Sequence, residues 1–259
     1  MPDLSIIIVS FNARADLERC LESLHAAPPK ASHEILVVDN RSTDGSVDGA
    51  RRWPGVRVIE NDVNAGFARA NNTGIRASTG AALLLLNSDT IVPPGAIDRL
   101  LSELDAPDVA VVGPRLVDGT GRAELSFGRM IGPWNEWRQK RLARSARVES
   151  VTRRRHYPDW VSGACLLVRR PDAEAVGLLD ERYFMYTEDV DFCAAIRARG
   201  RRVLFTPDVQ VVHQRGRSRA AAPADTRAAY RRSQIAFYEK HHPFWAPLLK
   251  LCLRVRREV

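Results

Sequence analysis

The chain has 259 residues, of which 45% are hydrophobic and 27% are charged. This composition excludes a chain that is disordered as a whole, and the length allows one large domain or two small ones. Lys and Arg outnumber Asp and Glu by 39 to 31, and the formal net charge of +8 favours partners that carry phosphate or an anionic membrane surface.

Strands alternate with helices in the first half of the chain. Short apolar runs predict strands at 6–9, 34–38, 56–59, 82–86 and 109–112. Helical spacing, with turn and capping residues before it, predicts helices at 13–26, from the 42–45 turn toward residue 52, at 68–77 and at 94–104. This alternation indicates βαβ units and an α/β fold with a mainly parallel sheet.

The second half is less regular. Asp118–Gly121 predicts a hairpin turn, and the strongly basic segment Arg138–Arg155 has few apolar residues, so we expect it to be a mobile loop. Further strands are predicted at 163–168, 203–205 and 209–212, and helices at 189–199 and 225–240. No internal repeat is present, and no linker separates two independent domains.

No apolar run has the length of a secretory signal or of a membrane-spanning helix. The four cysteines, at positions 20, 165, 193 and 252, are too scattered for a disulfide framework or a zinc module. We therefore expect reduced thiols and a cytoplasmic protein, with any membrane contact peripheral and on the inner face of the plasma membrane.

Polar residues follow the predicted parallel strands. In open sheets of this kind the ligand binds at the carboxyl ends of the strands. All four strand ends that meet there are polar, and three carry a carboxylate: Ser10–Asn12, Asp39–Asn40, Glu60–Asn61 and Asn87–Asp89. We therefore expect a ligand at this rim of the sheet.

Asn87 and Asp89 follow a buried strand and lie two residues apart, hence on the same side of an extended chain. A divalent cation such as Mg²⁺ takes oxygen ligands and uses one or two carboxylates together with substrate phosphates, a role that suits Asp89. A helix cap or an Asx turn is the alternative, and for an isolated aspartate it is the more common explanation.

Asp39 and Phe11 lie on neighbouring loops of the rim. The Asp39 carboxylate can accept a hydrogen bond from a nucleobase imide, or it can cap the next helix, a role that Asp44 could fill instead. Phe11 can stack on a base or fold into the core, and the sequence leaves both readings open.

Three carboxylates, Glu188, Asp189 and Asp191, lie at the start of a predicted helix, after the aromatic stretch Tyr183–Tyr186. A helix N-terminus favours negative charge, which explains part of this cluster without a catalytic role. Crowding of carboxylates also raises the pKa of at least one of them, and a raised carboxyl pKa suits a general base.

His213 follows a predicted strand and precedes Arg215, Arg217 and Arg219. A lone histidine in such a place is more often structural. The arginines change this reading, because arginine side chains hold phosphates well and a neutral imidazole is a good metal ligand.

Several segments resemble, in order, the inverting nucleotide-sugar glycosyltransferases of family 2. They are Ile6–Asn12 (IIIVSFN), Val37–Gly45 (VVDNRSTDG), Asn64–Ile75 (NAGFARANNTGI), Leu86–Asp89 (LNSD) and Thr187–Asp191 (TEDVD). The rhamnosyltransferase-like branch of the family is the most similar, because it also carries segments like Trp160–Ala164 and Gly177–Glu181. Each motif is weak alone, but their shared order over Leu4 to about Ser218 is specific.

The resemblance implies a GT-A fold, an αβα sandwich with a mainly parallel, Rossmann-like sheet and a smaller acceptor-binding half. It implies a nucleotide-sugar-binding half at 1–113, an acceptor-binding and catalytic half at 114–224, and a basic helical tail at 225–259.

The resemblance also assigns roles to residues. The nucleotide would be bound by Ser10, Phe11, Asn12, Asp39, Asn64, Asn71, Asn87 and Ser88. A cation, Mg²⁺ or Mn²⁺, would be held by Asp89 and His213, since Asn87 replaces the first acid of the family's usual metal motif. Asp189 would be the general base, with Glu188 beside it. Trp160, Ser162 and Gly163 would line the acceptor site, and the diphosphate would be bound by Arg215, Arg217 and Arg219.

The implied donor is a nucleoside-diphosphate sugar, with dTDP-L-rhamnose as the first expectation and a UDP-hexose as the alternative. The acceptor would be a hydroxyl of a glycan, a glycolipid or a small molecule. Departure of the diphosphate builds negative charge, which a cation and arginines can offset. Asp189 would take the proton of the attacking hydroxyl, and the anomeric configuration would invert in one displacement.

Other classes fit less well. A sugar nucleotidyltransferase needs a glycine-rich basic loop after its first strand, and Ser10–Ala15 contains no glycine. A nucleic-acid-binding module would interleave aromatic with basic residues, but Arg138–Arg155 contains no aromatic residue, so we do not expect nucleic acid as a partner. A glycosidase is disfavoured by the nucleotide-like rim.

The C-terminal tail mixes the apolar segment Phe244–Leu253 with Lys250, Arg254, Arg256 and Arg257. This mixture is compatible with an interfacial helix attracted to anionic lipid. It is equally compatible with a solvated basic face on a helix that packs against the domain. The sequence leaves these alternatives, and the oligomeric state, open.

Overall fold

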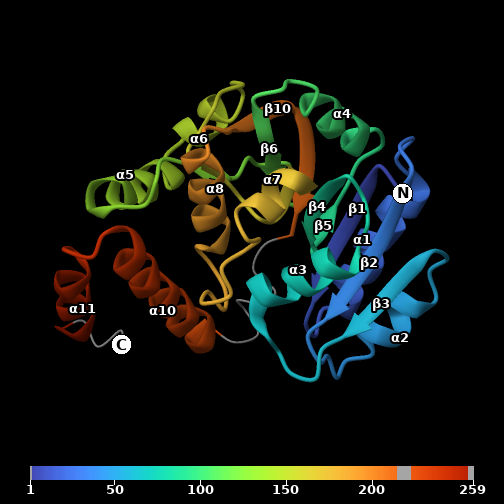
Figure 1. The fold of residues 1–259 in the computed structure, drawn as a ribbon, viewed down its shortest axis with the longest axis horizontal. Helices are drawn as coiled ribbons and strands as arrows, with labels where there is room; N and C mark the ends of the chain where they lie inside the picture. Colours follow the sequence, from blue (N-terminus) through green and yellow to red (C-terminus); the bar gives the residue numbers. More distant parts are fainter. Residues whose placement is uncertain (1, 215–222, 256–259) are drawn as a thin grey trace.

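The computed structural model describes residues 2–214 and 223–255 (Figure 1). The described chain contains an eight-stranded sheet with the strand order β3-β2-β1-β4-β9-β6-β10-β5, and a two-stranded sheet formed by β7 and β8. Four of the seven strand pairs in the large sheet are parallel, and the three antiparallel pairs are β4–β9, β6–β9 and β10–β5. The predicted α/β fold with a mainly parallel sheet is confirmed.

The predicted strands of the first half are all present. The large sheet consists of β1 (Leu4–Ser10), β2 (His33–Asp39), β3 (Val56–Glu60), β4 (Ala82–Asn87), β5 (Thr90–Ile91), β6 (Val109–Val117), β9 (Cys165–Arg169) and β10 (Arg202–His213), and the small sheet of β7 (Phe127–Gly128) and β8 (Trp160–Val161). The two strands predicted at 203–205 and 209–212 are one strand, β10, whose register against β6 shifts between Thr206 and Gln210. Pro207 lies in this irregular stretch, and a proline breaks the pattern of a regular strand.

The helices are α1 (Arg14–Ala26), α2 (Ser46–Arg51), α3 (Gly66–Ala77), α4 (Ala96–Glu103), α5 (Pro133–Ala143), α6 (Arg147–Val151), α7 (Arg170–Ala175), α8 (Glu188–Ala198), α10 (Pro223–His241) and α11 (Ala246–Val255). The mobile loop expected at Arg138–Arg155 is wrong, because most of that segment belongs to α5 and α6. No residue of α5 is fully buried, so the sequence carries no apolar stripe that would have predicted a helix.

The sheet separates two hydrophobic cores. Ile6 and Ile8 of β1 pack with Leu21 of α1 on one face. Ile7 packs with Phe192 of α8 on the other face, which α3 also covers. Successive side chains of a strand point to opposite faces, so each face of the apolar strand β1 belongs to a different core. Helices therefore cover both faces, as in a three-layer sandwich (Figure 1).

The C-terminal helices form a third hydrophobic cluster, in which Phe237 and Tyr238 of α10 and Ala246 of α11 meet Tyr183 and Val190. Strands from both expected halves share the large sheet, and β6 runs across position 113. The division into 1–113, 114–224 and 225–259 stays a prediction. No helix in the described part of the chain has the length and apolar character needed to span a membrane.

Candidate active site

The carboxyl ends of the parallel strands bring the predicted rim residues side by side. Ser10 lies opposite Asp39 in the β1–β2 register, and Asp39 lies opposite Glu60 in the β2–β3 register. On the other side of β1, Val9 lies opposite Asn87 of β4. The rim of the sheet is therefore a continuous row of polar strand ends.

Asp39 is buried, and only one of its oxygens has a partner. Its Oδ2 accepts a hydrogen bond of 2.7 Å from the N–H of Ser42. Its Oδ1 and the Oγ of Ser10 are buried and have no hydrogen-bond partner among the described residues. Leaving a buried acceptor unsatisfied costs about 1–3 kcal/mol, so these atoms mark a place where a ligand can donate hydrogen bonds.

Asp44 satisfies the start of α2 instead of Asp39. Its Oδ1 accepts hydrogen bonds from the N–H and the hydroxyl of Ser46, at 3.0 and 2.5 Å, and its Oδ2 accepts one of 2.8 Å from the N–H of Arg14. Asp39 is thus not needed to complete this helix. The helix-capping alternative for Asp39 has no support in the structure.

Phe11 and Asn12 lie on the loop after β1. The Phe11 side chain is 45% exposed, so the ring is not part of the core. The Oδ1 of Asn12 accepts a hydrogen bond of 2.8 Å from the N–H of Thr43, and the N–H of Asn12 donates to Ser42 Oγ at 2.8 Å. Asn12 therefore ties the β1 loop to the β2 loop, while Phe11 faces solvent beside them.

Asn64 and Asn71 frame the N-terminal part of α3. Asn64 Oδ1 accepts a hydrogen bond of 3.1 Å from the N–H of Gly66, and Asn71 keeps a buried Oδ1 with no partner among the described residues. Gly66 has a left-handed φ of +81°, and a Cβ there would lie 2.3 Å from the carbonyl oxygen of Phe184. Glycine is required because the start of α3 contacts the segment that leads to the acidic cluster.

Asp89 and His213 meet where β4 and β10 end. His213 Nε2 lies 3.3 Å from Asp89 Oδ1 and 3.4 Å from Asn87 Nδ2. On the other side of the ring, His213 Nδ1 lies 3.2 Å from Glu124 Oε2. Burial alone would lower the pKa of His213, but the hydrogen bonds to Asp89 and Glu124 outweigh it and raise the pKa to about 9.

Glu124 is a site residue that the sequence reading missed. It follows the turn at Asp118–Gly121 and reaches a histidine 89 positions further along the chain. A carboxylate on one ring nitrogen fixes the tautomer of a histidine and leaves the other nitrogen free to bind a metal. No local motif around Glu124 could have indicated this contact.

The geometry of Asp89 and His213 is compatible with a divalent cation. Two neighbouring ligands of an octahedral ion, each about 2.1 Å from it, lie about 3.0 Å apart, close to the separation of these two side chains. Within the described chain, no group of three or more His, Cys, Asp or Glu residues could hold a metal ion. The pair therefore fits a cation whose remaining ligands are phosphate oxygens and water.

Asp189 is connected to the end of β4 through two consecutive residues. Its Oδ2 accepts a hydrogen bond of 2.9 Å from the N–H of Gly163. The carbonyl of Ala164, the next residue, accepts a hydrogen bond of 2.9 Å from the N–H of Asn87. The turn before β9 thus holds the predicted base beside the end of β4.

Gly163 permits this close packing. A Cβ at position 163 would lie 3.3 Å from Asp189 Cβ and 3.3 Å from Phe67 Cε1, tighter than ordinary carbon contacts. Gly163 is thus in contact with Asp189 and with the first turn of α3. Ser162 Oγ accepts a hydrogen bond of 3.3 Å from the N–H of Ala164 and supports the same turn.

Glu188 and Asp189 are adjacent but differ in environment. Glu188 is buried, and its Oε2 has no hydrogen-bond partner within the described residues. Burial, and then the charge of Asp189, raise the pKa of Glu188 well above its ordinary value. The two adjacent carboxyl groups therefore differ, since only that of Glu188 is fully buried.

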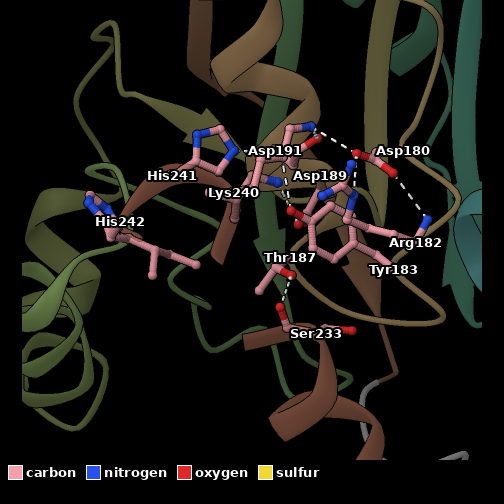
Figure 2. A network of polar contacts seen from close by, with 12 residues as sticks. Asp180, Arg182, Tyr183, Thr187, Asp189, Asp191, Ser233, Lys240, His241 and His242 are labelled. Carbon is pink, nitrogen blue, oxygen red and sulfur yellow. Dashed lines mark hydrogen bonds and ion pairs between the residues drawn. The ribbon is translucent and has the colours of Figure 1, made fainter. Parts of the chain in front are cut away.

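Asp191 is the centre of a polar network (Figure 2). Its Oδ1 accepts hydrogen bonds from the Tyr183 hydroxyl at 3.2 Å and from His241 Nε2 at 2.6 Å, and its Oδ2 accepts one from Lys240 Nζ at 2.8 Å. Lys240 also contacts Asp180 at 2.9 Å. The third acid of the cluster therefore anchors the end of α10 to the start of α8, a contact that the sequence did not indicate.

Two further predicted residues lie close to this arrangement, because Ser88 stands between Asn87 and Asp89, and Trp160 packs against the cluster that contains Tyr183 and Val190. The Trp160 indole donates to the carbonyl of Arg129 at 2.9 Å, and Ser88 lies in the turn between β4 and β5. A hollow of about 290 Å³, lined in part by Tyr157 and Arg201, lies at the start of β10, the opposite end of that strand from His213. The predicted diphosphate ligands fall outside the described residues: Arg215, Arg217 and Arg219.

A mainly parallel sheet that ends in a row of polar residues is compatible with the GT-A fold that the sequence resemblance implies. The family model described as "Glycosyl transferase family 2" matches residues 5–168. The chain belongs to this family. The predicted enzyme class is confirmed, and the sugar nucleotidyltransferase reading is disfavoured.

Among curated proteins, the chain is similar to the N-acetylglucosaminyl-diphospho-decaprenol L-rhamnosyltransferase of Mycobacterium tuberculosis (strain ATCC 25618 / H37Rv). The two are 32% identical over 283 residues, which cover 97% of this chain and 89% of the relative. The O-antigen biosynthesis protein RfbC of Myxococcus xanthus is 29% identical over 260 residues, which cover 95% of this chain and 20% of the relative.

Among solved structures, the mannosyltransferase PcManGT from Pyrobaculum calidifontis, in complex with GDP-Man and Mn²⁺, has a TM-score of 0.67 and 21% identity, with 96% of this chain and 68% of that chain covered. GalNAc-T7 with UDP, GalNAc and Mn²⁺ has a TM-score of 0.63 and 19% identity, with 83% and 44% covered. These likenesses confirm the predicted GT-A fold.

Proposed function

We propose that this glycosyltransferase moves L-rhamnose from dTDP-L-rhamnose to a hydroxyl group of a lipid-linked glycan. The transfer inverts the anomeric carbon and uses Mg²⁺ or Mn²⁺ bound by Asp89 and His213. The printed name of the mycobacterial relative supports both the rhamnose and the lipid-linked acceptor. The Mn²⁺ named with two structures of the same fold supports the cation.

The observation that carries the proposal is the connection through Gly163 and Ala164. The N–H of Gly163 donates a hydrogen bond to the carboxylate of Asp189. The carbonyl of Ala164 accepts one from the N–H of Asn87, at the end of the strand that leads to Asp89. A displacement reaction needs a base on the acceptor side and charge stabilisation on the leaving-group side, held at a fixed spacing. A rigid two-residue connection supplies that spacing.

The donor's nucleobase is assigned to the Asp39 pocket. The unpaired Asp39 Oδ1 and Ser10 Oγ are hydrogen-bond acceptors, and a pyrimidine imide N–H is a matching donor. The exposed ring of Phe11 lies on the adjacent loop, where it can stack on the base. These features support thymine or uracil.

The chemical roles follow from position and charge. Asp189 accepts the proton of the acceptor hydroxyl as that oxygen attacks the anomeric carbon, and the N–H of Gly163 orients its carboxylate. Glu124 holds His213 in the tautomer whose Nε2 faces Asp89. When bound, the cation neutralises charge that develops on the departing diphosphate. The raised pKa of Glu188 favours its protonated form, which lowers the repulsion between the two adjacent carboxyl groups.

A donor panel tests the proposal. The full chain is given dTDP-L-rhamnose, UDP-hexoses or GDP-mannose with an N-acetylglucosaminyl-diphospho-polyprenol, and products are identified by mass spectrometry and their anomeric configuration by NMR. We expect a rhamnosyl product of inverted configuration with the first donor only. A hexosyl product would assign the UDP-hexose alternative, and retained configuration would refute the single displacement.

Ligand-dependent stability tests donor binding separately from transfer. A nucleotide that binds only the folded chain stabilises it by about 2.7 kcal/mol at a concentration of 100 times Kd. We expect dTDP with Mn²⁺ or Mg²⁺ to raise the Tm more than GDP does. A Tm that no nucleoside diphosphate changes would contradict the nucleotide site.

A further inference from the structure

The helices α5 and α11 begin side by side and lie at the end of the molecule away from β3 (Figure 1). His242 Nε2 lies 2.6 Å from the carbonyl oxygen of Ile131, two residues before α5. Ile131 and Ala246, the first residue of α11, also pack in the same hydrophobic cluster. The basic segment and the C-terminal tail singled out in the sequence therefore meet in the structure, where α5 and α11 begin.

The outward side of α11 is apolar. Leu248, Leu251, Cys252 and Val255 are all exposed, and their spacing of three and four residues puts them on one face of the helix. The opposite face packs inward through Ala246 and Leu253. Phe244, just before the helix, is 96% exposed. A helix that packs by one face and exposes a second apolar face has an unpartnered surface.

The outward side of α5 has the same spacing with different residues. Trp134 and Trp137 are 76% and 57% exposed, and Arg138 and Arg141 follow on the same face. The Arg141 guanidinium lies 5.5 Å from the centre of the Trp137 ring. Tryptophan beside arginine on one face is typical of a helix that lies in the interface of a membrane.

The only acid in these two helices points inward. Glu136 of α5 accepts hydrogen bonds from Tyr230, Gln234 and Tyr238 of α10, at 3.1, 2.7 and 3.1 Å. This contact fixes the rotation of α5 and turns its tryptophans outward. Four arginines of these two segments are exposed, and Lys250 of α11 pairs with Glu239 of α10. The exposed arginines are Arg138, Arg141, Arg144 and Arg254.

We propose that α5 and α11 form one lipid-facing surface, made of Trp134, Trp137, Phe244, Leu248, Leu251 and Val255, that docks on an anionic bilayer. The apolar residues enter the headgroup boundary, and the surrounding arginines contact anionic headgroups. Charge complementarity favours a bilayer over a second copy of this chain, since two identical basic surfaces would repel each other. In this proposal α11 has the apolar outward face of an interfacial helix and an opposite face that packs against the rest of the chain.

This surface is joined to the proposed active site by α10. The helix ends in Lys240 and His241, which bind Asp191 two residues after the base, and α11 follows within five residues. Docking would hold the active site at a fixed height above the bilayer, within reach of a lipid-linked acceptor. That consequence rests on the proposed function, whereas the docking itself does not.

Vesicle flotation of the full-length chain tests the docking. The vesicles contain either phosphatidylglycerol with phosphatidylcholine or phosphatidylcholine alone. We expect binding to the anionic vesicles only, weakened by salt. Phe244→Ser with Leu251→Ser should lower the partition coefficient about tenfold or more, as expected for one or two large apolar side chains. Val63→Ser, at an exposed apolar residue between β3 and α3, is the matched control and should bind as the wild type does.

A charge variant tests the arginines. Arg138→Gln with Arg141→Gln should lower the partition coefficient about 30-fold, from about 1 kcal/mol for each basic residue near an anionic surface. Arg52→Gln with Arg199→Gln removes the same net charge elsewhere and should have little effect. If the two double variants bound the anionic vesicles equally well, the proposal would be overturned, because net charge alone would then explain the attraction.

Two other results would also overturn it. One is the absence of flotation of the wild type on anionic vesicles. The other is a dimer, detected by sedimentation velocity, that the Phe244 and Leu251 substitutions dissociate, since a second copy would then cover the surface. The stabilisation by dTDP should be the same in all these variants. A failure of docking with dTDP binding intact would therefore leave the proposed function standing.

Discussion

Replacing Asp39 with asparagine tests recognition of the nucleobase separately from the stability of the fold. Asp39 Oδ2 accepts the Ser42 N–H, whereas the buried Oδ1 has no partner among the described residues. An asparagine keeps an oxygen for Ser42 and places an NH₂ group where Oδ1 was. The imide N–H of the nucleobase would then face the NH₂ group of the asparagine, which is also a hydrogen-bond donor. A hydrogen bond to a charged group contributes about 1.5–3 kcal/mol, so the Kd of dTDP should rise about 10- to 150-fold.

Asp44→Asn is the matched control, because it changes a neighbouring aspartate on the same loop. Both Asp44 oxygens already accept hydrogen bonds, from Ser46 and Arg14. Turning one oxygen into a donor should lower the free energy of unfolding by about 1–3 kcal/mol and change the Kd of dTDP little. Asp39→Asn should have the opposite pattern, since it removes a buried negative charge that has only one protein donor.

Isothermal titration calorimetry with dTDP and Mg²⁺ measures the Kd, and urea unfolding measures the stability of each variant. The reasoning is refuted if Asp39→Asn binds dTDP as tightly as the wild type. It is also refuted if Asp44→Asn weakens binding to the same extent, because the effect would then come from the loop and not from Oδ1.

Four further changes test the rest of the site. Asp189→Asn should keep dTDP binding but slow transfer about 10²–10⁴-fold in initial-rate assays, and near-normal turnover would exclude it as the base. Excess chelator should abolish transfer and Asp89→Ala should reproduce the loss, whereas full activity in chelator would remove the cation from the mechanism. Gly163→Ala places a Cβ 3.3 Å from Asp189 Cβ, so kcat should fall while the Kd of dTDP stays constant; the reverse pattern would contradict the positioning role. Because burial raises the pKa of Glu188, the folded chain holds this proton to higher pH than the unfolded chain does, and the stability of the wild type should fall as pH rises above about 4.3. Glu188→Gln should remove that fall. The difference in the free energy of unfolding between the variant and the wild type, measured by urea unfolding, should therefore grow in favour of the variant from acidic to neutral pH. A difference that is constant with pH would contradict the raised pKa of Glu188.

The parallel part of the fold was predictable from the sequence because burial there is local and periodic. β1 and β4 are continuous apolar runs, and each ends at a polar residue. Parallel strands bring such ends to one edge, so Ser10, Asp39 and Asn87 could be placed together before any coordinates were known. Three of the five family motifs, Ile6–Asn12, Val37–Gly45 and Leu86–Asp89, contain these strand ends, and the shared order of all five motifs made the enzyme class predictable.

The parts that could not be predicted depend on contacts between distant residues. α5 buries no residue fully, and it is held by Glu136, whose partners on α10 lie 94 to 102 positions away. Glu124 contacts His213 across 89 positions, and Lys240 contacts Asp191 across 49. A periodicity argument considers a window of 11–18 residues at most, about one helix or hairpin, and such pairs lie outside it.

The C-terminal helices also support the segment that precedes Asp189. Tyr186 and Thr187, directly before the acid pair, have φ values of 70° and 67°, a left-handed conformation that costs a non-glycine residue about 1–3 kcal/mol. α10 offsets this strain, because Ser233 Oγ donates to the Met185 carbonyl at 2.7 Å and Thr187 Oγ1 donates to the Ser233 carbonyl at 3.4 Å. The position of Asp189 therefore depends on α10 as well as on the sheet. Glu136 joins α5 to the same helix, so α10 contacts both α5 and the segment that precedes Asp189.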